Sequence, residues 1–194
     1  MRIIIALLIK LWKAGGSMSA ETDILTLEQI NGMSRTQFVE ALGGIFEHSP
    51  WVAEEAYAYL PVRSAEELHR VMLQTARSAP RSQVDELLRA HPDLATRLQV
   101  TPLSAAEQQG AGLDRLTAEE FERLTGLNAA YTEKFGFPFI LAVRGKNKDD
   151  IIEAISERVH HPLEQEREQA LEEIGRITGF RLHDLLPEAG GAAG

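Results

Sequence analysis

The chain has 194 residues, including 20 basic and 29 acidic side chains and no cysteine, which gives a formal net charge of −9. A chain of this length can bury a substantial core within one domain. The absence of cysteine excludes disulfides, thiolate zinc sites, iron–sulfur clusters and a cysteine nucleophile. From residue 18 onward, 17 basic residues face 29 acidic ones, and aromatic residues make up 6% of the chain. A body with this charge repels phosphate backbones, so nucleic acid is not expected as a partner.

The two ends of the chain differ in composition from the rest. Residues 3–9 form an apolar run behind one arginine, which is too short to span a bilayer. Three interpretations stay open for residues 1–17: an over-extended start, a short interfacial or targeting helix, and a secretion signal. The expected division is an N-terminal extension over residues 1–20, a helical domain over 21–187 and a flexible tail over 188–194. We expect a cytoplasmic protein without stable membrane insertion.

The body of the chain has the pattern of successive helices. Serine or threonine followed three residues later by Glu or Gln is the spacing of a capping box, and it recurs before apolar residues with helical periodicity. The pairs are Thr26 with Gln29, Ser34 with Gln37, Ser64 with Glu67, and Thr117 with Glu120. Ser49 followed by Pro50 predicts an N-cap with proline at the first helical position. With further helices expected over 148–159 and 162–180, the sequence predicts an all-α, single-domain helical bundle.

One apolar run interrupts the helical pattern. Residues 137–143 read FPFILAV, with a proline inside the run. Its composition taken alone suits a buried strand, but no second strand is indicated nearby to pair with its backbone groups. We therefore expect a buried irregular turn that leads into a helix.

Two residues stand where either a chemical or a structural role is possible. His91 follows a helix expected around residues 84–88, and Pro92 biases it away from helical backbone, which holds the imidazole on a rigid turn. It can exchange protons near neutral pH, or it can bond free carbonyl groups at the helix end. Glu107 follows Ser104 at capping-box spacing, so it can cap that helix or face a ligand at its N-terminus. The six histidines match no metal-binding spacing, so no metal site is expected.

Four segments, taken in order, resemble one family. They are residues 46–53 (FEHSPWVA), 91–95 (HPDLA), 104–113 (SAAEQQGAGL) and 128–146 (NAAYTEKFGFPFILAVRGK). The pattern spans residues 26–186 and is similar to that of the 2-oxo-4-hydroxy-4-carboxy-5-ureidoimidazoline (OHCU) decarboxylases of urate degradation. The last segment is long and specific, whereas the HPDLA pentad alone is weak. One departure is Leu60-Pro61-Val62, where family members often carry Arg-Pro-Phe, and it puts the packing there in question.

The resemblance implies a homodimeric, all-helical enzyme that converts OHCU to (S)-allantoin without a cofactor. His91 maps onto the catalytic histidine of the family. Glu107 is assigned to orient and polarise the substrate or to hold the tautomer of His91. Contacts with the small-molecule substrate are expected from Pro92, Ser104, Ala105, Ala106, Glu107, Gln108, Phe139, Ile140, Leu141, Ala142, Val143 and Arg181, the last as a partner for an anion.

The chemistry of this substrate is consistent with an enzyme that needs no cofactor. Its carboxylate lies on a carbon next to a C=N bond, so the electron pair released with CO2 delocalises into the ring. We assign to His91 the acid/base role, as the proton donor that fixes the S configuration. Backbone amides near Ala142 and at the helix start at Ser104 are expected to bind ring oxygens. Two alternatives stay open: a non-catalytic helical interaction module, and a small-molecule-binding protein that has lost catalysis.

Overall fold

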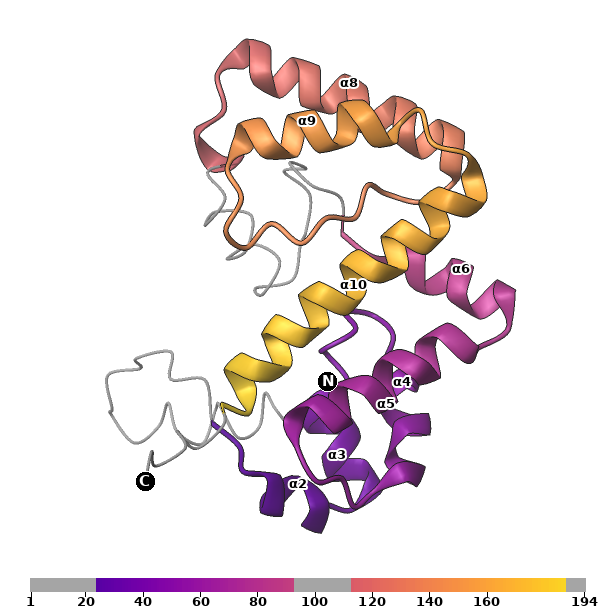
Figure 1. The fold of residues 1–194 in the computed structure, drawn as a ribbon, viewed down its shortest axis with the longest axis vertical. Coiled ribbons are helices and arrows are strands. Elements are labelled where there is room, and N and C mark those ends of the chain that lie inside the picture. Colours follow the sequence, from indigo (N-terminus) through magenta and orange to yellow (C-terminus); the bar gives the residue numbers. More distant parts are fainter. Residues whose placement is uncertain (1–23, 93–112, 188–194) are drawn as a thin grey trace, which may run out of the picture.

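The computed structural model describes residues 24–92 and 113–187 (Figure 1). Within these two ranges the chain forms helices and no strand, which confirms the predicted all-α class. The elements are α2 (Leu27–Gly32), α3 (Arg35–Leu42), α4 (Trp51–Ala56), η1 (Tyr57–Tyr59), α5 (Ala65–Ser78), α6 (Arg81–Ala90), η2 (Leu113–Arg115), α8 (Ala118–Phe135), α9 (Lys148–Arg158) and α10 (Leu163–Leu185). The expected N-terminal extension, the expected tail and the segment 104–108 lie outside the described residues.

Helix α10 connects the two ends of the fold. It has 23 residues and lies diagonally between a group formed by α2–α5 and the pair formed by α8 and α9 (Figure 1). It packs against α5, and α4 packs against α3 and α5, while α8 and α9 pack against each other. A side chain on α10 can therefore contact a segment that lies more than a hundred residues away from it in the sequence, as Arg181 does with Ile45.

Four helices begin where local capping predicted. Capping boxes form at Thr26, Ser34 and Thr117, and Ser64 accepts a hydrogen bond from the Glu67 N–H, as expected. The start of α4 differs, because Pro50 is its N-cap and the predicted cap at Ser49 is wrong by one residue. The physical reason is that the chain already turns before the helix: the Val52 N–H donates to the Ser49 carbonyl at 3.2 Å, so Ser49 lies inside a turn.

Two glycines bring α5 close to α10. A Cβ atom at Gly175 would lie 3.1 Å from Cδ2 of Leu73, and one at Gly179 would lie 3.4 Å from Cε1 of His69. The imidazole of His69 lies with its Nε2 atom 3.0 Å from Oγ1 of Thr178. This close packing fixes the position of α10 relative to the helices of the N-terminal half.

The Leu60-Pro61-Val62 segment, where the sequence departs from the family pattern, is well packed. Val62 is a core residue with 3% of its surface exposed. The side chain of Asn31 donates to the Val62 carbonyl at 2.8 Å and accepts from the Val62 N–H at 2.9 Å. These paired bonds satisfy the backbone where it enters the core, so the departure leaves no packing defect there.

Residues 137–143 form the buried irregular segment that the sequence predicted. The segment leaves α8 through Gly136, whose φ of 75° is left-handed and favours glycine. It contains neither helix nor strand, and its side chains join the core, with Phe139 fully buried. After a turn, Asn147 caps α9. The segment passes between α10 and the α8–α9 pair (Figure 1).

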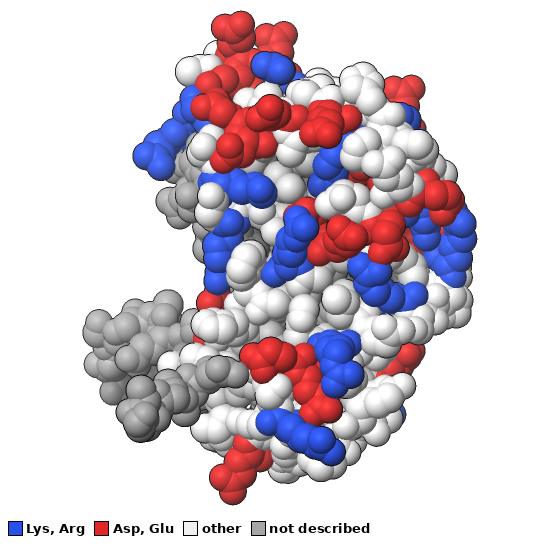
Figure 2. Space-filling model, viewed as in Figure 1, with Lys and Arg blue, Asp and Glu red and all other residues white. Residues whose placement is uncertain are grey.

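The surface carries interspersed charges. On the face shown in Figure 2, Lys and Arg side chains alternate with Asp and Glu, and no continuous basic patch is present. In the part of the chain that the structure describes, no helix is long and apolar enough to cross a membrane.

Candidate active site

His91 is held at the end of α6. It is the C-cap of this helix, its backbone is extended with φ −72° and ψ 137°, and its N–H donates to the Leu88 carbonyl at 3.3 Å. The extended backbone is what Pro92 imposes on the residue before it. The rigid turn predicted for His91 is therefore confirmed, and both His91 and Pro92 are partly buried.

A buried ion pair joins the N-terminal half of the domain to α10. An Oε1 atom of Glu47 lies 2.6 Å from Nη2 of Arg181, and each side chain is 2% exposed. Arg181 also donates from Nη1 to the Ile45 carbonyl at 3.3 Å. Two charges this deeply buried are stable only as a well-bonded pair, since either alone would pay a large desolvation penalty.

The backbone of Glu47 is strained. Its φ of 53° is left-handed, and Glu47 is the one non-glycine residue with positive φ among the described residues. Such a conformation costs on the order of 1–2 kcal/mol in an L-residue. The ion pair with Arg181 holds the carboxylate in place despite this cost. Strain concentrated on a buried charged residue is typical of a functional site.

The electrostatics place His91 in the same cluster. Burial lowers the pKa of His91 to about 4; the Glu47 carboxylate opposes this shift, whereas the neighbouring Arg181 and His48 add to it. At neutral pH the imidazole is therefore uncharged in the free protein. The turn after α3, the end of α6 and the C-terminal half of α10 thus converge on one set of titratable groups.

Sequence reasoning missed Glu47. It lies within the segment 46–53 that carries part of the family resemblance, but no residue in that segment was singled out as functional. An acidic residue shortly after Gly43-Gly44 is a weak signal, because many exposed turns share that composition. Only the tertiary contact with Arg181 separates Glu47 from the other acidic residues of the chain.

The predicted pocket wall, residues 139–143, is also attached to α10. The Ala142 N–H donates to Oε2 of Glu173 at 2.9 Å. The Ala142 N–H thus already has a buried acceptor, and the binding of ring oxygens by backbone amides near Ala142 stays a prediction. Among the described residues, none accepts a hydrogen bond from the neighbouring Leu141 N–H, although Leu141 is 6% exposed.

The structure brings some of the predicted site residues together and leaves others untested. His91 and Arg181 share one cluster, whereas residues 139–143 make no hydrogen bond to that cluster among the described residues. Glu173 and Arg181, which serve the two parts, are eight residues apart on α10, or about 12 Å along the helix axis. The predicted substrate-binding residues Ser104, Ala105, Ala106, Glu107 and Gln108 lie outside the described residues.

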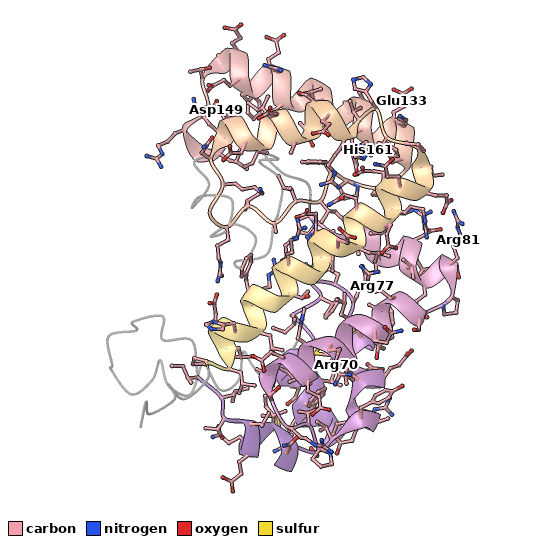
Figure 3. All side chains as sticks on the ribbon, viewed as in Figure 1. Arg70, Arg77, Arg81, Glu133, Asp149 and His161 are labelled. Atoms are coloured by element: carbon pink, nitrogen blue, oxygen red, sulfur yellow. The ribbon has the colours of Figure 1, made fainter. Side chains whose placement is uncertain are left out.

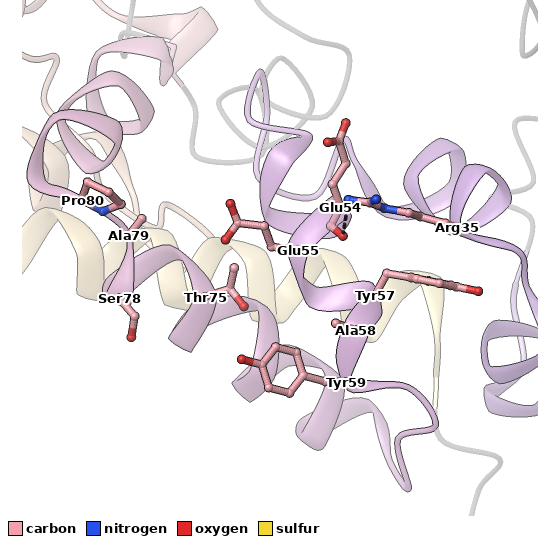
Figure 4. Close-up of a pocket in the computed structure, with 10 residues that line it drawn as sticks. All are labelled: Arg35, Glu54, Glu55, Tyr57, Ala58, Tyr59, Thr75, Ser78, Ala79 and Pro80. Atoms are coloured by element: carbon pink, nitrogen blue, oxygen red, sulfur yellow. Dashed lines mark hydrogen bonds between the residues drawn. The ribbon is translucent and has the colours of Figure 1, made fainter.

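A groove elsewhere on the molecule shares no residue with this cluster. It lies where α4 and η1 meet α5, and its lining includes Arg35 and Tyr59 (Figure 4). Arg35 donates there to the Glu54 carbonyl at 3.2 Å, and Tyr59 is 63% exposed. Its polar groups are open to solvent, so the groove lacks the desolvated charges that characterise the His91 cluster.

Comparison with known proteins identifies the family of this chain. The family model for OHCU decarboxylase matches residues 31–183, a range that includes Glu47, His91, residues 139–143 and Arg181. The chain belongs to the OHCU decarboxylase family. It is 44% identical over 158 residues to a 2-oxo-4-hydroxy-4-carboxy-5-ureidoimidazoline decarboxylase of Haloferax volcanii, covering 81% of this chain and 94% of that protein. The corresponding mouse protein is 36% identical, with 84% and 93% covered.

Longer relatives and solved structures extend the comparison. The chain spans about a third of the length of the uric acid degradation bifunctional proteins of two Bacillus species, and it is 42% identical to each. The crystal structure of an (S)-allantoin synthase superposes with a TM-score of 0.70 at 33% identity, covering 84% of this chain and 54% of that one. An OHCU decarboxylase structure obtained in the presence of (S)-allantoin superposes with a TM-score of 0.61 at 22% identity, covering 73% and 94%, and supports the fold.

Proposed function

We propose that this protein catalyses the cofactor-independent decarboxylation of OHCU to (S)-allantoin in urate degradation. The observation that carries the proposal is the cluster of the partly buried His91 and the buried Glu47–Arg181 ion pair inside the matched family region. The alternative, a non-catalytic interaction module, does not account for a cluster of titratable groups that includes Glu47 in a strained backbone conformation. Among the alternatives, decarboxylation gives these residues a chemical purpose.

His91 is the acid/base group in this proposal. Since its pKa lies well below neutrality in the free protein, the imidazole enters the reaction uncharged and accepts a proton first. When CO2 leaves, the electron pair moves into the ring and a solvent proton joins the ring nitrogen. His91 takes the proton of the adjacent hydroxyl group and delivers it to one face of the neighbouring ring carbon, which sets the S configuration. His91 is thus the proton donor predicted from the sequence, and it receives the proton that it donates from the substrate during the reaction.

Arg181 and the backbone of residues 139–143 bind the substrate in this proposal. Arg181 supplies a positive charge for the substrate carboxylate, while Glu47 keeps its guanidinium in one orientation. The Leu141 N–H is a buried donor that suits a ring oxygen. Glu107 keeps the role predicted from the sequence, which is to polarise the hydroxyl or ureido group or to hold the tautomer of His91.

The activity is tested with OHCU made freshly from urate by enzymes that supply it, while the optical activity of the allantoin formed is recorded. The protein should produce (S)-allantoin, and His91→Asn should reduce the rate of OHCU loss to the spontaneous level. Racemic allantoin at the spontaneous rate with the folded wild-type protein would exclude the proposed reaction. Glu107→Ala should reduce activity and, if Glu107 also caps its helix, stability by about 1 kcal/mol. Lower stability with unchanged activity would leave Glu107 a cap alone.

Two further expectations belong to the same proposal. The family resemblance favours a homodimer, and light scattering tests this directly by measuring the molar mass of the protein in solution. We also expect the protein to act in the cytoplasm, where fractionation of the source cells should find it. Neither expectation is needed for the chemistry assigned to His91.

A further inference from the structure

Two buried carboxylates on α10 are linked to the predicted substrate-binding segment, one directly and the other through Arg158. Glu166 is fully buried and Glu173 is 2% exposed. They are seven residues apart, so they lie on the same face of the helix about two turns from each other. Burying a carboxylate costs several kcal/mol unless its oxygens accept hydrogen bonds. The hydrogen-bond partners of Glu166 and Glu173 therefore account for their burial.

Glu173 binds the backbone of the segment directly. Its Oε2 atom accepts the Ala142 N–H at 2.9 Å. Its Oε1 atom accepts from Nη1 of Arg176 at 2.6 Å and from Nε2 of Gln169 at 3.0 Å. Arg176 is 57% exposed, so it balances the charge of Glu173 from the solvent side. The inner oxygen is thereby left to the backbone alone.

Glu166 acts on the segment through Arg158. Its Oε1 atom accepts from Nε of Arg158 at 2.9 Å, and Arg158 in turn donates from Nη1 to the Ile140 carbonyl at 2.9 Å. The guanidinium carbon of Arg158 lies 4.6 Å from the centroid of the Phe139 ring. His161, at the junction of α9 and α10 (Figure 3), places Nδ1 2.8 Å from Oε2 of Glu166. Both oxygens of the Glu166 carboxylate therefore have hydrogen-bond partners, and Arg158 is bonded to Glu166 as well as to the segment.

The two attachments hold backbone groups on either side of Leu141 in the sequence. They hold the Ile140 carbonyl and the Ala142 N–H, which belong to residues two positions apart. In a trans peptide, the carbonyl of one residue and the N–H of the next point in opposite directions. The Leu141 N–H is therefore directed away from Arg158, which holds the Ile140 carbonyl, and none of the described residues accepts a hydrogen bond from it.

We propose that Glu173 is a positioning residue that orients the Leu141 N–H toward the substrate by holding the Ala142 N–H from the α10 side. The proposal rests on the proposed function, in which residues 139–143 contact OHCU. The recognised chemistry is an oxygen acceptor on a small, planar, anionic ring. Without Glu173, Ala142 has a buried donor with no acceptor, and the peptide can rotate to find one. Such a rotation turns the Leu141 carbonyl, which shares a peptide plane with the Ala142 N–H, and the resulting change in the backbone of Leu141 displaces its own N–H.

The test compares Glu173→Met with Glu172→Met. Both substitutions remove one carboxylate from α10, but Glu172 is exposed and lines a groove between α5 and α10. Glu173→Met should raise the KM for OHCU about tenfold, with a much smaller change in kcat. This is the effect expected when one hydrogen bond to the substrate, that of the Leu141 N–H, is weakened. Glu172→Met should match the wild type. Glu173→Gln keeps an acceptor oxygen for Ala142 and should restore KM to within about threefold of the wild type.

The outcomes separate this proposal from the function on which it rests. A wild-type protein that does not convert OHCU refutes the function itself. An active wild type together with a folded Glu173→Met variant of unchanged KM overturns the positioning role, even if that variant melts at a lower temperature. If Glu173→Met does not fold, hydrogen exchange of the Ala142 amide decides. The Glu173→Gln variant keeps an acceptor for this amide, so both its protection and its KM should stay close to those of the wild type. Lost protection together with an unchanged KM overturns the proposal.

Discussion

The depressed pKa of His91 makes the stability of this protein depend on pH in a specific way. Burial lowers that pKa from 6.5 to about 4, so the folded state binds fewer protons than the unfolded state between these two values. Stability is therefore unaffected above the unfolded pKa and falls as pH drops from 6.5 toward 4. At about pH 5 the loss should reach about 2 kcal/mol relative to neutral pH, because the unfolded imidazole is then mostly protonated and the folded one is not.

Urea unfolding of the wild type, His91→Asn and His160→Asn measures this effect. Each protein is unfolded near neutral pH and at about pH 5, and the change in the free energy of unfolding is compared between variants. The wild type should lose about 2 kcal/mol more than His91→Asn, which has no imidazole to protonate at this position. His160→Asn replaces an exposed histidine and should behave like the wild type. Equal losses in all three proteins would show that His91 is not held neutral by its surroundings, and the proton-accepting role would fail with it.

Two further changes probe the buried charge networks. Glu47→Gln should destabilise the fold by about 3–5 kcal/mol, because it removes the negative charge opposite buried Arg181. The double variant with Arg181→Met should cost less than the sum of the two single changes in urea unfolding, and strict additivity would contradict direct coupling. Burial and the Glu166 carboxylate raise the pKa of Tyr131, so its hydroxyl stays protonated and donates to Glu166. Tyr131→Phe should therefore cost about 1.5–3 kcal/mol in thermal or urea unfolding and leave kcat unchanged, and a large fall in kcat at normal stability would place Tyr131 in the reaction.

Much of the helical framework could be predicted because its signals are local. The capping pairs at Thr26, Ser34 and Thr117 lie within four residues of the groups they satisfy, so the sequence shows both partners. The rigid turn at His91 likewise follows from the proline after it. The start of α4 was misplaced by one residue, because the turn through Ser49 depends on backbone bonds that side-chain spacing does not report.

The site was predicted less completely because its main contacts span long distances in the sequence. Glu47 meets Arg181 across the fold, and Glu173 meets Ala142 from a different element. Both glutamates have the composition and spacing of ordinary surface residues, in a chain with 29 acidic side chains. The exposed Glu172 beside Glu173 shows how little the local sequence distinguishes the two.

The all-helical class, the helix caps and the rigid turn at His91 could be predicted from the amino-acid sequence, because each depends on residues that are close together in the chain. The family could be predicted from an ordered pattern of segments. Tertiary structure alone decided which carboxylates are buried, which backbone donor each one holds and that His91 is uncharged at neutral pH. These properties arise from desolvation and from charges brought together by packing, and α10 is the element that brings them together.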